Sequence, residues 1–163
     1  MFLGLDLGTS AVKALLVDED GQPVASQSAP LAVSRPHQGW SEQDPEEWWQ
    51  AATLAVRALG HAKPRELAAV KAIGLSGQMH GLTALDSAMR PLRPAILWND
   101  TRSAAQAARL DRAHPELRAT GGNAVMPGFT APKAVWMAEA EAELFCAMAM
   151  ILLPKDYMRL RMT

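Results

Sequence analysis

The chain has 163 residues, of which 49% are hydrophobic and 20% charged, and its formal net charge at pH 7 is −1. This length and composition are typical of one globular domain with a sizeable core. So small a net charge gives no long-range field that would recruit nucleic acid or an anionic membrane. The single cysteine, Cys146, cannot form an internal disulfide. With no signal peptide and no apolar run as long as a membrane span, we expect a cytoplasmic protein.

Residues 2–17 predict a β-hairpin. Apolar runs at 2–5 and 11–17 flank Asp6 and a short turn with one glycine and two hydroxyl residues. These turn residues are Gly8, Thr9 and Ser10. Glycine allows a ligand to approach the backbone, and successive amides in such a turn favour an anion.

The acid at the start of this turn indicates a metal. A carboxylate beside a phosphate repels it unless a cation lies between them, so we interpret Asp6 as acting on a magnesium ion or its water ligands. Lys13 adds a positive charge in the second strand. The alternative is an ordinary hairpin turn, because Asp, Gly, Thr and Ser are all common turn residues.

The next segments predict a mixed sheet. Residues 22–33 indicate a third strand that completes an antiparallel meander. Asp44 caps a helix with Glu47 completing a capping box, and Gly60 ends it. A further strand at 69–77 follows this helix, and a strand–helix–strand unit of this length predicts a parallel pair.

A second group of candidate residues follows the strand at 69–77. Ligands of open α/β sheets bind beyond the carboxyl ends of strands, so we expect the 78–81 loop and the turn after Asp6 to face one cleft. Short strands are expected at 82–86 and 94–98, followed by Asn99 and Asp100. This pair is either a helix cap, with Asp100 or Thr101 capping a helix to Ala113, or part of a ligand site.

The remaining residues predict mainly helices. Residues 114–131, rich in glycine and proline, are expected to be irregular. Helices are expected from residue 132 and around 141–146, then a buried strand at 147–153 and a last helix from residue 154 to 163.

Several blocks of the chain, taken together and in order, resemble the xylulokinase branch of the FGGY carbohydrate kinase family, within the actin-like ATPase superfamily. The blocks are Leu5–Ser10, Ser34–His37, Trp40–Pro45, Gly77–Gly81, Arg93–Asp100, Met126–Lys133 and Leu152–Tyr157. The resemblance implies an α/β, ribonuclease H-like (actin-like ATPase) fold, with a mixed sheet, an N-terminal antiparallel meander and flanking helices. It also implies that residues 1–163 are an incomplete N-terminal kinase domain, without the general base, the second phosphate motif or the adenosine pocket.

The activity implied by the resemblance is transfer of the γ-phosphate of ATP to the 5-hydroxyl of D-xylulose, with Mg²⁺. Asp6 matches the family's magnesium-associated acid, which acts through water. Gly8, Thr9, Ser10 and Lys13 match its phosphate-binding positions. Gln78, Met79, His80 and Asn99 match its sugar side.

Two alternatives remain beside this assignment. One is a kinase for another sugar or polyol of the same family, and the other is a non-catalytic sugar-binding or actin-like module. His80 is interpreted as a hydrogen-bond partner of a sugar hydroxyl, and the alternative is a histidine that only satisfies loop backbone. A truncated first domain should also expose apolar surface, so we expect homo-oligomers or self-association through that face.

Overall fold

A computed structural model describes residues 1–163, which form two compact units. Unit 1 consists of Met1–Val33, Asp44–Gln78 and Pro154–Thr163. Unit 2 consists of Ser34–Gln43 and Met79–Leu153. Each unit is therefore assembled from segments that are distant in the sequence.

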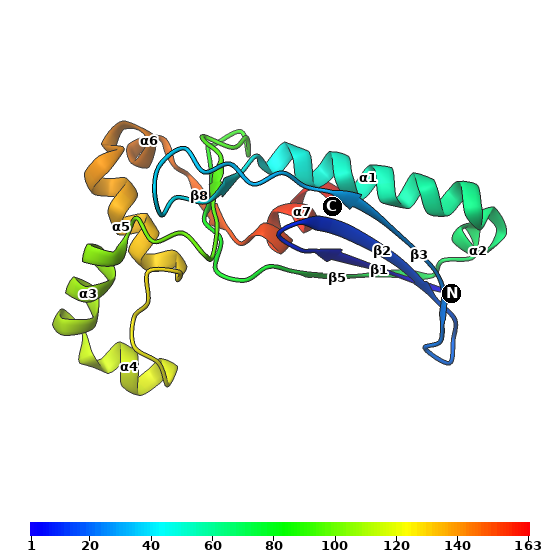
Figure 1. Ribbon diagram of the computed structural model, residues 1–163, viewed down its shortest axis with the longest axis horizontal. Coiled ribbons are helices and arrows are strands. Elements are labelled where there is room, and N and C mark those ends of the chain that lie inside the picture. The colour runs from blue at the N-terminus through cyan, green and yellow to red at the C-terminus, as the bar shows by residue number, and fades with distance from the viewer. The chain divides into compact units, whose positions relative to one another are not determined.

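Unit 1 is built on a four-stranded sheet with the order β3-β2-β1-β5. Strands β1 (Phe2–Leu7), β2 (Ala11–Val17) and β3 (Pro23–Pro30) form an antiparallel meander, and β5 (Ala72–Gly77) pairs parallel to β1. These pairings confirm the predicted mixed sheet with its N-terminal meander and its parallel pair. Figure 1 shows the four strands side by side, with helix α1 running along them.

The two faces of this sheet differ in chemistry. Leu3, Leu5 and Leu7 of β1 are buried, and the residues between them point to the opposite face. On that opposite face, the register places Asp6 beside Lys13 of β2 and Ser76 of β5. The strand periodicity therefore separates a core-facing row of leucines from a row of polar side chains.

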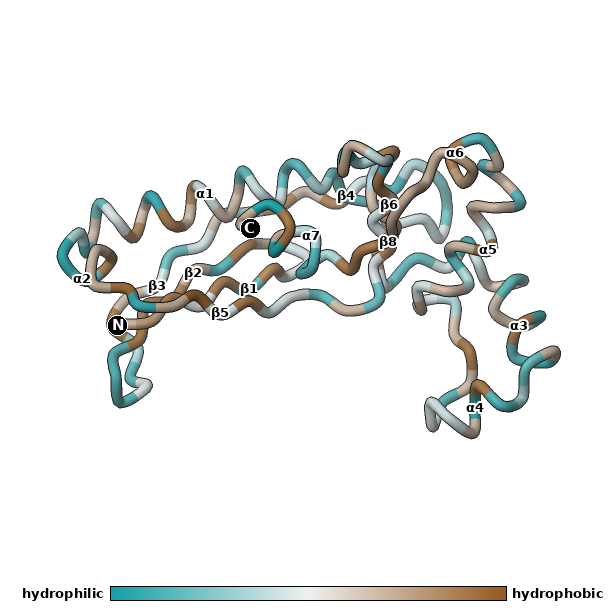
Figure 2. Tube along the Cα trace, turned by 180° about the vertical axis from the view of Figure 1, so that it is seen from behind, coloured by the Kyte–Doolittle hydropathy of each residue, from teal (hydrophilic) through white to brown (hydrophobic).

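Helix α1 (Pro45–Ala62) packs on the sheet through β2 and β3. Its buried face is formed by Pro45, Trp48, Ala51, Ala52, Ala55 and Leu59, and its hydropathy alternates along the tube in Figure 2. The Asp44 side chain caps the helix by accepting from the Glu46 amide at 2.9 Å, so the bond expected with residue 47 is not the one that forms.

The predicted end of α1 is wrong by two residues. The helix continues through Gly60 to Ala62, and a second short helix, α2 (Pro64–Ala68), follows at once. A residue before proline is disfavoured in the α region, so Pro64 makes Lys63 leave the helix, with φ −141°. Because α2 occupies the next residues, β5 begins at Ala72 rather than at residue 69.

The C-terminal helix α7 (Pro154–Met162) begins at Pro154, as predicted. It belongs to unit 1. Tyr157 is buried and its ring lies edge-on to that of Trp48, with centroids 6.1 Å apart. The guanidinium of Arg161 lies over the Trp49 ring at 5.1 Å. Both tryptophans therefore pack against α7 within unit 1.

Unit 2 combines two small antiparallel sheets with four helices. Strand β4 (Glu42–Gln43) pairs with β7 (Ala95–Ile96), and β6 (Thr83–Leu85) pairs with β8 (Met150–Leu152). The helices are α3 (Ala104–Ala113), α4 (Pro115–Gly121), α5 (Thr130–Ala140) and α6 (Ala142–Ala147). Its apolar core is formed by Leu82, Ala84, Ile96 and Met137.

Two predictions for unit 2 are wrong. Residues 114–131 are not wholly irregular, because Pro115 suits the first turn of α4 and Gly122, with φ 71°, ends that helix. The strand expected at 147–153 is only Met150–Leu152, and it is not buried, since Met150 and Ile151 are 38% and 37% exposed. No helix in the chain combines the length and the apolar character needed to cross a membrane.

Candidate functional site

Asp6 lies at the end of β1 on the polar face of the unit 1 sheet. The parallel register with β5 brings Ser76 beside it, and the Ser76 hydroxyl donates to Asp6 Oδ1 at 2.5 Å. One carboxylate oxygen is therefore held by a charge-assisted hydrogen bond, which orients the exposed carboxylate. Asp6, Ser76 and Lys13 line a hollow of about 440 Å³ together with Gly4, Leu5, Leu15, Gly74 and Leu75.

The turn that follows Asp6 is closed by its own backbone. The Gly8 amide donates to the Ala11 carbonyl oxygen at 3.0 Å, so it contributes to the shape of the turn. A Cβ atom at Gly8 would lie 3.0 Å from that oxygen, which explains why glycine suits this position. Leu31 follows the end of β3, and its amide stabilises the turn by donating to the Ser10 carbonyl oxygen at 2.9 Å.

Gln78 contacts this same turn. The Thr9 hydroxyl donates to Gln78 Oε1 at 3.2 Å, and the Gln78 amide extends the β1–β5 pairing by donating to the Leu7 carbonyl oxygen at 2.8 Å. The Gln78 side chain is buried in unit 1. The structure thus places Gln78, which the sequence assigned to the sugar side, against a predicted phosphate-binding residue.

The residues around Asp6 fit a magnesium ion that takes most of its ligands from water and from substrate phosphates. No group of three or more His, Cys, Asp or Glu side chains that could hold a metal occurs in residues 1–163. Magnesium usually keeps several water ligands and binds through one or two carboxylates plus substrate phosphates. A single oriented carboxylate beside a glycine-containing turn is consistent with that mode of binding.

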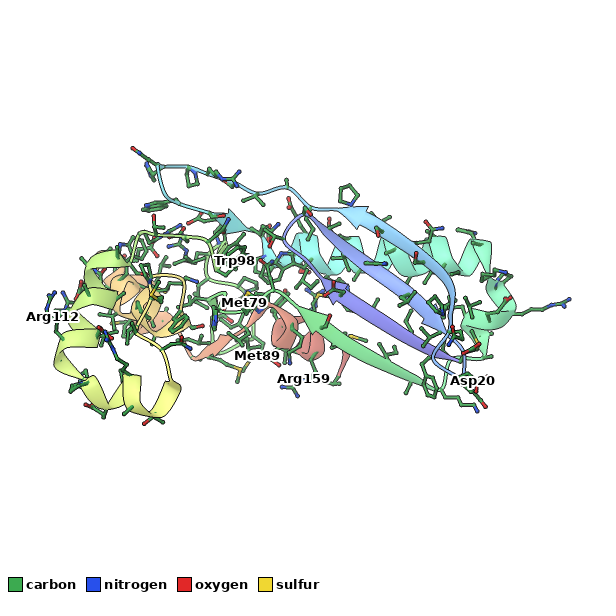
Figure 3. All side chains as sticks on the ribbon, turned by 60° about the horizontal axis from the view of Figure 1, so that its bottom comes forward. Asp20, Met79, Met89, Trp98, Arg112 and Arg159 are labelled. Atoms are coloured by element: carbon green, nitrogen blue, oxygen red, sulfur yellow. The ribbon has the colours of Figure 1, made fainter.

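A second hollow, of about 470 Å³, lies in unit 2 and brings together two of the predicted sugar-side residues, His80 and Asn99. Its remaining lining residues are Trp98, Asp100, Thr101, Met126, Pro127, Gly128 and Phe129. Met79 is 55% exposed and Trp98 is 43% exposed, and both are labelled in Figure 3. Met79 itself is not among the residues that line the hollow.

His80 is held in an unusual backbone conformation. Its φ is 58°, in the left-handed region that costs a non-glycine residue roughly 1–2 kcal/mol. Its ring lies against that of Phe129, with centroids 4.6 Å apart. Its carbonyl oxygen accepts from Lys133 Nζ at 2.7 Å and from the Thr130 hydroxyl at 3.2 Å. The loop is therefore fixed by contacts with the start of α5.

The Asp100 carboxylate accepts hydrogen bonds from backbone amides and from the Arg102 side chain. Its Oδ2 accepts from the Ser41 amide at 2.6 Å and from Arg102 Nη2 at 2.7 Å, and its Oδ1 accepts from the Arg102 amide and Nε, both at 2.9 Å. It does not cap α3, whose N-cap is Ser103, so the predicted cap at Asp100 or Thr101 is wrong. Asn99, by contrast, is exposed and lines the hollow.

A buried cluster of charges and tryptophans behind Asp100 was missed by the sequence reasoning. The Arg102 side chain is 1% exposed, pairs with Glu42 at 2.7 Å, and lies 3.5 Å from the Trp40 ring centroid and 4.9 Å from that of Trp136. Its buried Nη1 has no hydrogen-bond partner, which the nearby aromatic face partly offsets. The members come from separate segments, so no local pattern indicates that they meet.

Lys133, in the first turn of α5, is fully buried. Burial lowers its pKa to about 7; the negative charge of Asp100 opposes this shift and the positive charge of Arg102 adds to it. Its Nζ donates to Gly128's carbonyl oxygen at 2.8 Å as well as to His80's. The sequence places Lys133 in the Met126–Lys133 block of the family resemblance but gives it no role, because the feature that sets it apart is its burial in the fold.

Gly128 allows the 126–129 loop to lie against the backbone of Trp98. A Cβ atom at Gly128 would lie 2.4 Å from the Trp98 carbonyl oxygen, closer than real Cβ atoms approach. This contact joins two walls of the unit 2 hollow. Only glycine permits it without a backbone shift.

With this geometry in place, comparison with known proteins gives a consistent result. The profile of the "FGGY family of carbohydrate kinases, N-terminal domain" matches residues 1–163. The chain is 55% identical over 163 residues to the xylulose kinase of Escherichia coli (strain K12), covering 100% of this chain and 33% of that protein. It is 44% identical over 162 residues to the xylulose kinase of Bacillus subtilis (strain 168), covering 99% of this chain and 32% of that protein. The chain thus spans about one third of the length of these relatives.

Solved structures agree with the sequence matches. The crystal structure of a "xyloylose kinase" from Brucella ovis superposes with a TM-score of 0.95 at 60% identity, covering 98% of this chain and 33% of that chain. The xylulose kinase from Rhodospirillum rubrum gives a TM-score of 0.92 at 31% identity, covering 98% and 33%. These matches confirm the predicted fold, the ribonuclease H-like fold of actin-like ATPases.

The first prediction concerns the contact between Gly128 and Trp98. Gly128→Ala should lower the free energy of unfolding by about 1–3 kcal/mol, because the added methyl group overlaps the Trp98 carbonyl oxygen. The matched control is Gly121→Ala in α4, where a Cβ atom meets nothing within 4 Å. Urea unfolding of both variants measures the difference, and equal midpoints would show that the close approach is not a constraint.

The second prediction follows from the lowered pKa of Lys133. In the unfolded chain this lysine has an ordinary pKa of 10.5, so between pH 7 and 10.5 the unfolded state binds up to one proton more than the folded state. Stability should therefore rise with pH across this window, by at most about 1.4 kcal/mol per pH unit from this group.

Lys133→Met should remove this contribution. The free energy of unfolding of the wild type minus that of the variant should therefore increase from pH 7 to pH 10. The exposed Lys71→Met serves as the control and should leave the profile unchanged. Parallel profiles for wild type and Lys133→Met would contradict an abnormal Lys133 pKa.

Proposed function

Because the chain belongs to the FGGY family of carbohydrate kinases, we propose that it forms part of an enzyme that phosphorylates D-xylulose. The γ-phosphate of ATP is transferred to the 5-hydroxyl, which yields D-xylulose 5-phosphate and ADP. The observation that carries the proposal is the oriented Asp6 carboxylate beside the Gly8–Ser10 turn, a construction suited to a metal-bound phosphate. The xylulose kinases among the relatives support this choice of sugar.

We further propose that residues 1–163 are an incomplete N-terminal kinase domain. The relatives are about three times as long as this chain. Phosphoryl transfer depends on positioning and on charge stabilisation by groups around the whole nucleotide. On this proposal the general base, a second phosphate-binding motif and the adenosine pocket come from residues beyond 163.

In unit 1, Asp6 is proposed to act through water on a magnesium ion, and Ser76 holds the carboxylate in place. Thr9, Ser10 and Lys13 supply hydroxyl and ammonium donors for the phosphate oxygens. When bound, magnesium–ATP supplies the transferable phosphoryl group, and the metal neutralises charge on its oxygens. The β1–β5 pairing keeps Asp6 oriented through Ser76 before the reaction, and such preorganisation is a main source of catalysis.

In unit 2, His80 and Asn99 are proposed to hydrogen-bond sugar hydroxyls from the wall of the 470 Å³ hollow. Met79, and Gln78 of unit 1, are also proposed as sugar-side residues, on the family pattern alone. The contact between Gln78 and Thr9 gives Gln78 a second proposed role, which is to orient a phosphate-binding hydroxyl.

The proposal extends to location and assembly. A kinase of this family would act in the cytoplasm, where ATP and Mg²⁺ are available. The chain exposes several large apolar side chains, which are proposed to mediate self-association of these 163 residues. The most exposed of those on the unit 1 sheet are Phe2 at 39% and Ile73 at 48%. Two alternatives compete, a kinase for another sugar or polyol and a sugar-binding module without catalysis.

The third prediction tests the role of Asp6 in the full-length protein. Asp6→Asn removes the charge that a metal requires but keeps the size of the side chain. The turnover number should fall by at least about a hundredfold, while D-xylulose affinity changes less than threefold. Asp20→Asn, in the exposed turn between β2 and β3 labelled in Figure 3, is the control.

Coupled ADP release at saturating Mg²⁺ and ATP measures turnover, with D-xylulose, glycerol and another ketose compared as substrates. Unchanged turnover in Asp6→Asn would refute the metal role. No turnover by the wild type with any of the sugars would favour the binding module.

The fourth prediction concerns residues 1–163 alone. They should release no ADP above background with ATP, Mg²⁺ and D-xylulose, because only one side of the nucleotide site is present. Sedimentation of the same sample should show species larger than a monomer. Enzyme-like turnover would refute the missing-base argument, and a monomer at high concentration would refute self-association.

A further inference from the structure

Lys133 is the one lysine of unit 2, and its environment is unusual for a lysine. It is fully buried in the first turn of α5, next in sequence to Ala134, which packs against the unit 2 core. Lysines are almost never fully buried unless they are paired or hydrogen-bonded. The charged groups that interact electrostatically with Lys133 are Asp100 and Arg102. The hydrogen bonds of Lys133 go to neutral backbone oxygens.

The two hydrogen bonds of Lys133 join two loops that share a cavity. Nζ donates to the His80 carbonyl oxygen at 2.7 Å and to the Gly128 carbonyl oxygen at 2.8 Å. Both residues line the 470 Å³ hollow, one from the loop before β6 and the other from the loop before α5. Lys133 Nζ therefore bonds both walls at once, and the Thr130 hydroxyl adds a second, longer bond to the His80 carbonyl oxygen at 3.2 Å.

Each loop needs such an anchor. His80 has a φ of 58°, which a histidine adopts only when its surroundings hold it there. Gly128 lies so close to the Trp98 backbone that a Cβ atom would not fit. A methionine at 133 would fill similar space without the cost of burying an amine, so the polar head is explained by the carbonyls it binds.

We propose that Lys133 is a positioning residue for the sugar site, which holds the His80 loop and the 126–129 loop at the separation that a ketose requires. This inference rests on the proposed function, in that it takes the unit 2 hollow to be the sugar side of the kinase. Lys133 itself does not line the hollow, so it acts through the backbone of His80 and Gly128.

The test compares three variants of the full-length protein. Lys133→Met removes both hydrogen bonds and keeps the length of the side chain. Thr130→Val removes only the weaker second donor to the His80 carbonyl oxygen and leaves Lys133 in place. Lys71→Met makes the same chemical change as the first variant at an exposed lysine of unit 1.

We expect Lys133→Met to raise the KM for D-xylulose about tenfold or more, with the KM for ATP unchanged and kcat reduced less than KM is raised. Thr130→Val should shift the same constant in the same direction by a smaller factor, and Lys71→Met should not shift it. An unchanged sugar KM in Lys133→Met overturns the proposal. If Lys133→Met does not fold, Thr130→Val decides, because the His80 carbonyl oxygen loses its second donor, and an unchanged sugar KM there overturns the proposal that the bonds at this oxygen position the His80 loop for the sugar.

A second measurement separates this inference from the assignment of the substrate. Amide hydrogen exchange without sugar should become faster in Lys133→Met at residues 79–82 and 127–130, and not throughout unit 2. Faster exchange at both loops without any kinase activity in the wild type would refute the proposed function but retain Lys133 as the loop anchor. Unchanged exchange at both loops would refute the anchor, whatever the activity.

Discussion

The parallel pairing of β1 with β5 is the constraint on which unit 1 depends. It places Ser76 beside Asp6 and lets Gln78 continue the ladder to Leu7. Both candidate phosphate-side contacts, Ser76 with Asp6 and Gln78 with Thr9, are consequences of this one register. A shift by one residue would turn Asp6 toward the core and the leucines of β1 toward solvent. Burial of the leucine face therefore fixes the register that keeps Asp6 on the exposed face.

The site in unit 2 is held by a different physical device. Its walls are loops, whose backbone groups have no ladder partners, and buried backbone groups must still be satisfied. Side chains provide these bonds: Lys133 donates to two carbonyl oxygens, Asp100 accepts from two amides, and the Ser103 hydroxyl donates to the Pro127 carbonyl oxygen at 3.0 Å. Burying so many charges costs stability relative to an apolar core, but their hydrogen bonds give the cavity wall a defined shape.

This difference explains what the sequence could predict. The meander, the parallel pair and the position of Asp6 follow from strand periodicity and a short turn, which are local signals. Helix α4 was missed because glycine and proline were interpreted as loop residues, although here they begin and end a helix. The cluster around Arg102 was also missed, since Glu42, Trp136 and Arg102 meet only through tertiary packing. The sequence predicts Asp100 as a cap or a ligand, whereas in the fold its oxygens accept from the Ser41 amide and from Arg102.

The two devices also differ in how they should respond to mutation. In unit 1 the candidate site residues Asp6, Lys13 and Ser76 project from strands whose opposite face is core, so a polar substitution there should leave the fold largely intact. In unit 2 the groups that shape the cavity are themselves buried, and removing one partner of a buried charge leaves the other uncompensated. Arg102 is the clearest case, because it pairs with Glu42 and Asp100 and lies against Trp40. On the proposed function, sugar recognition should therefore vary more readily at the exposed Asn99 and Met79 than at the buried residues, since only the exposed positions can change without disturbing this network.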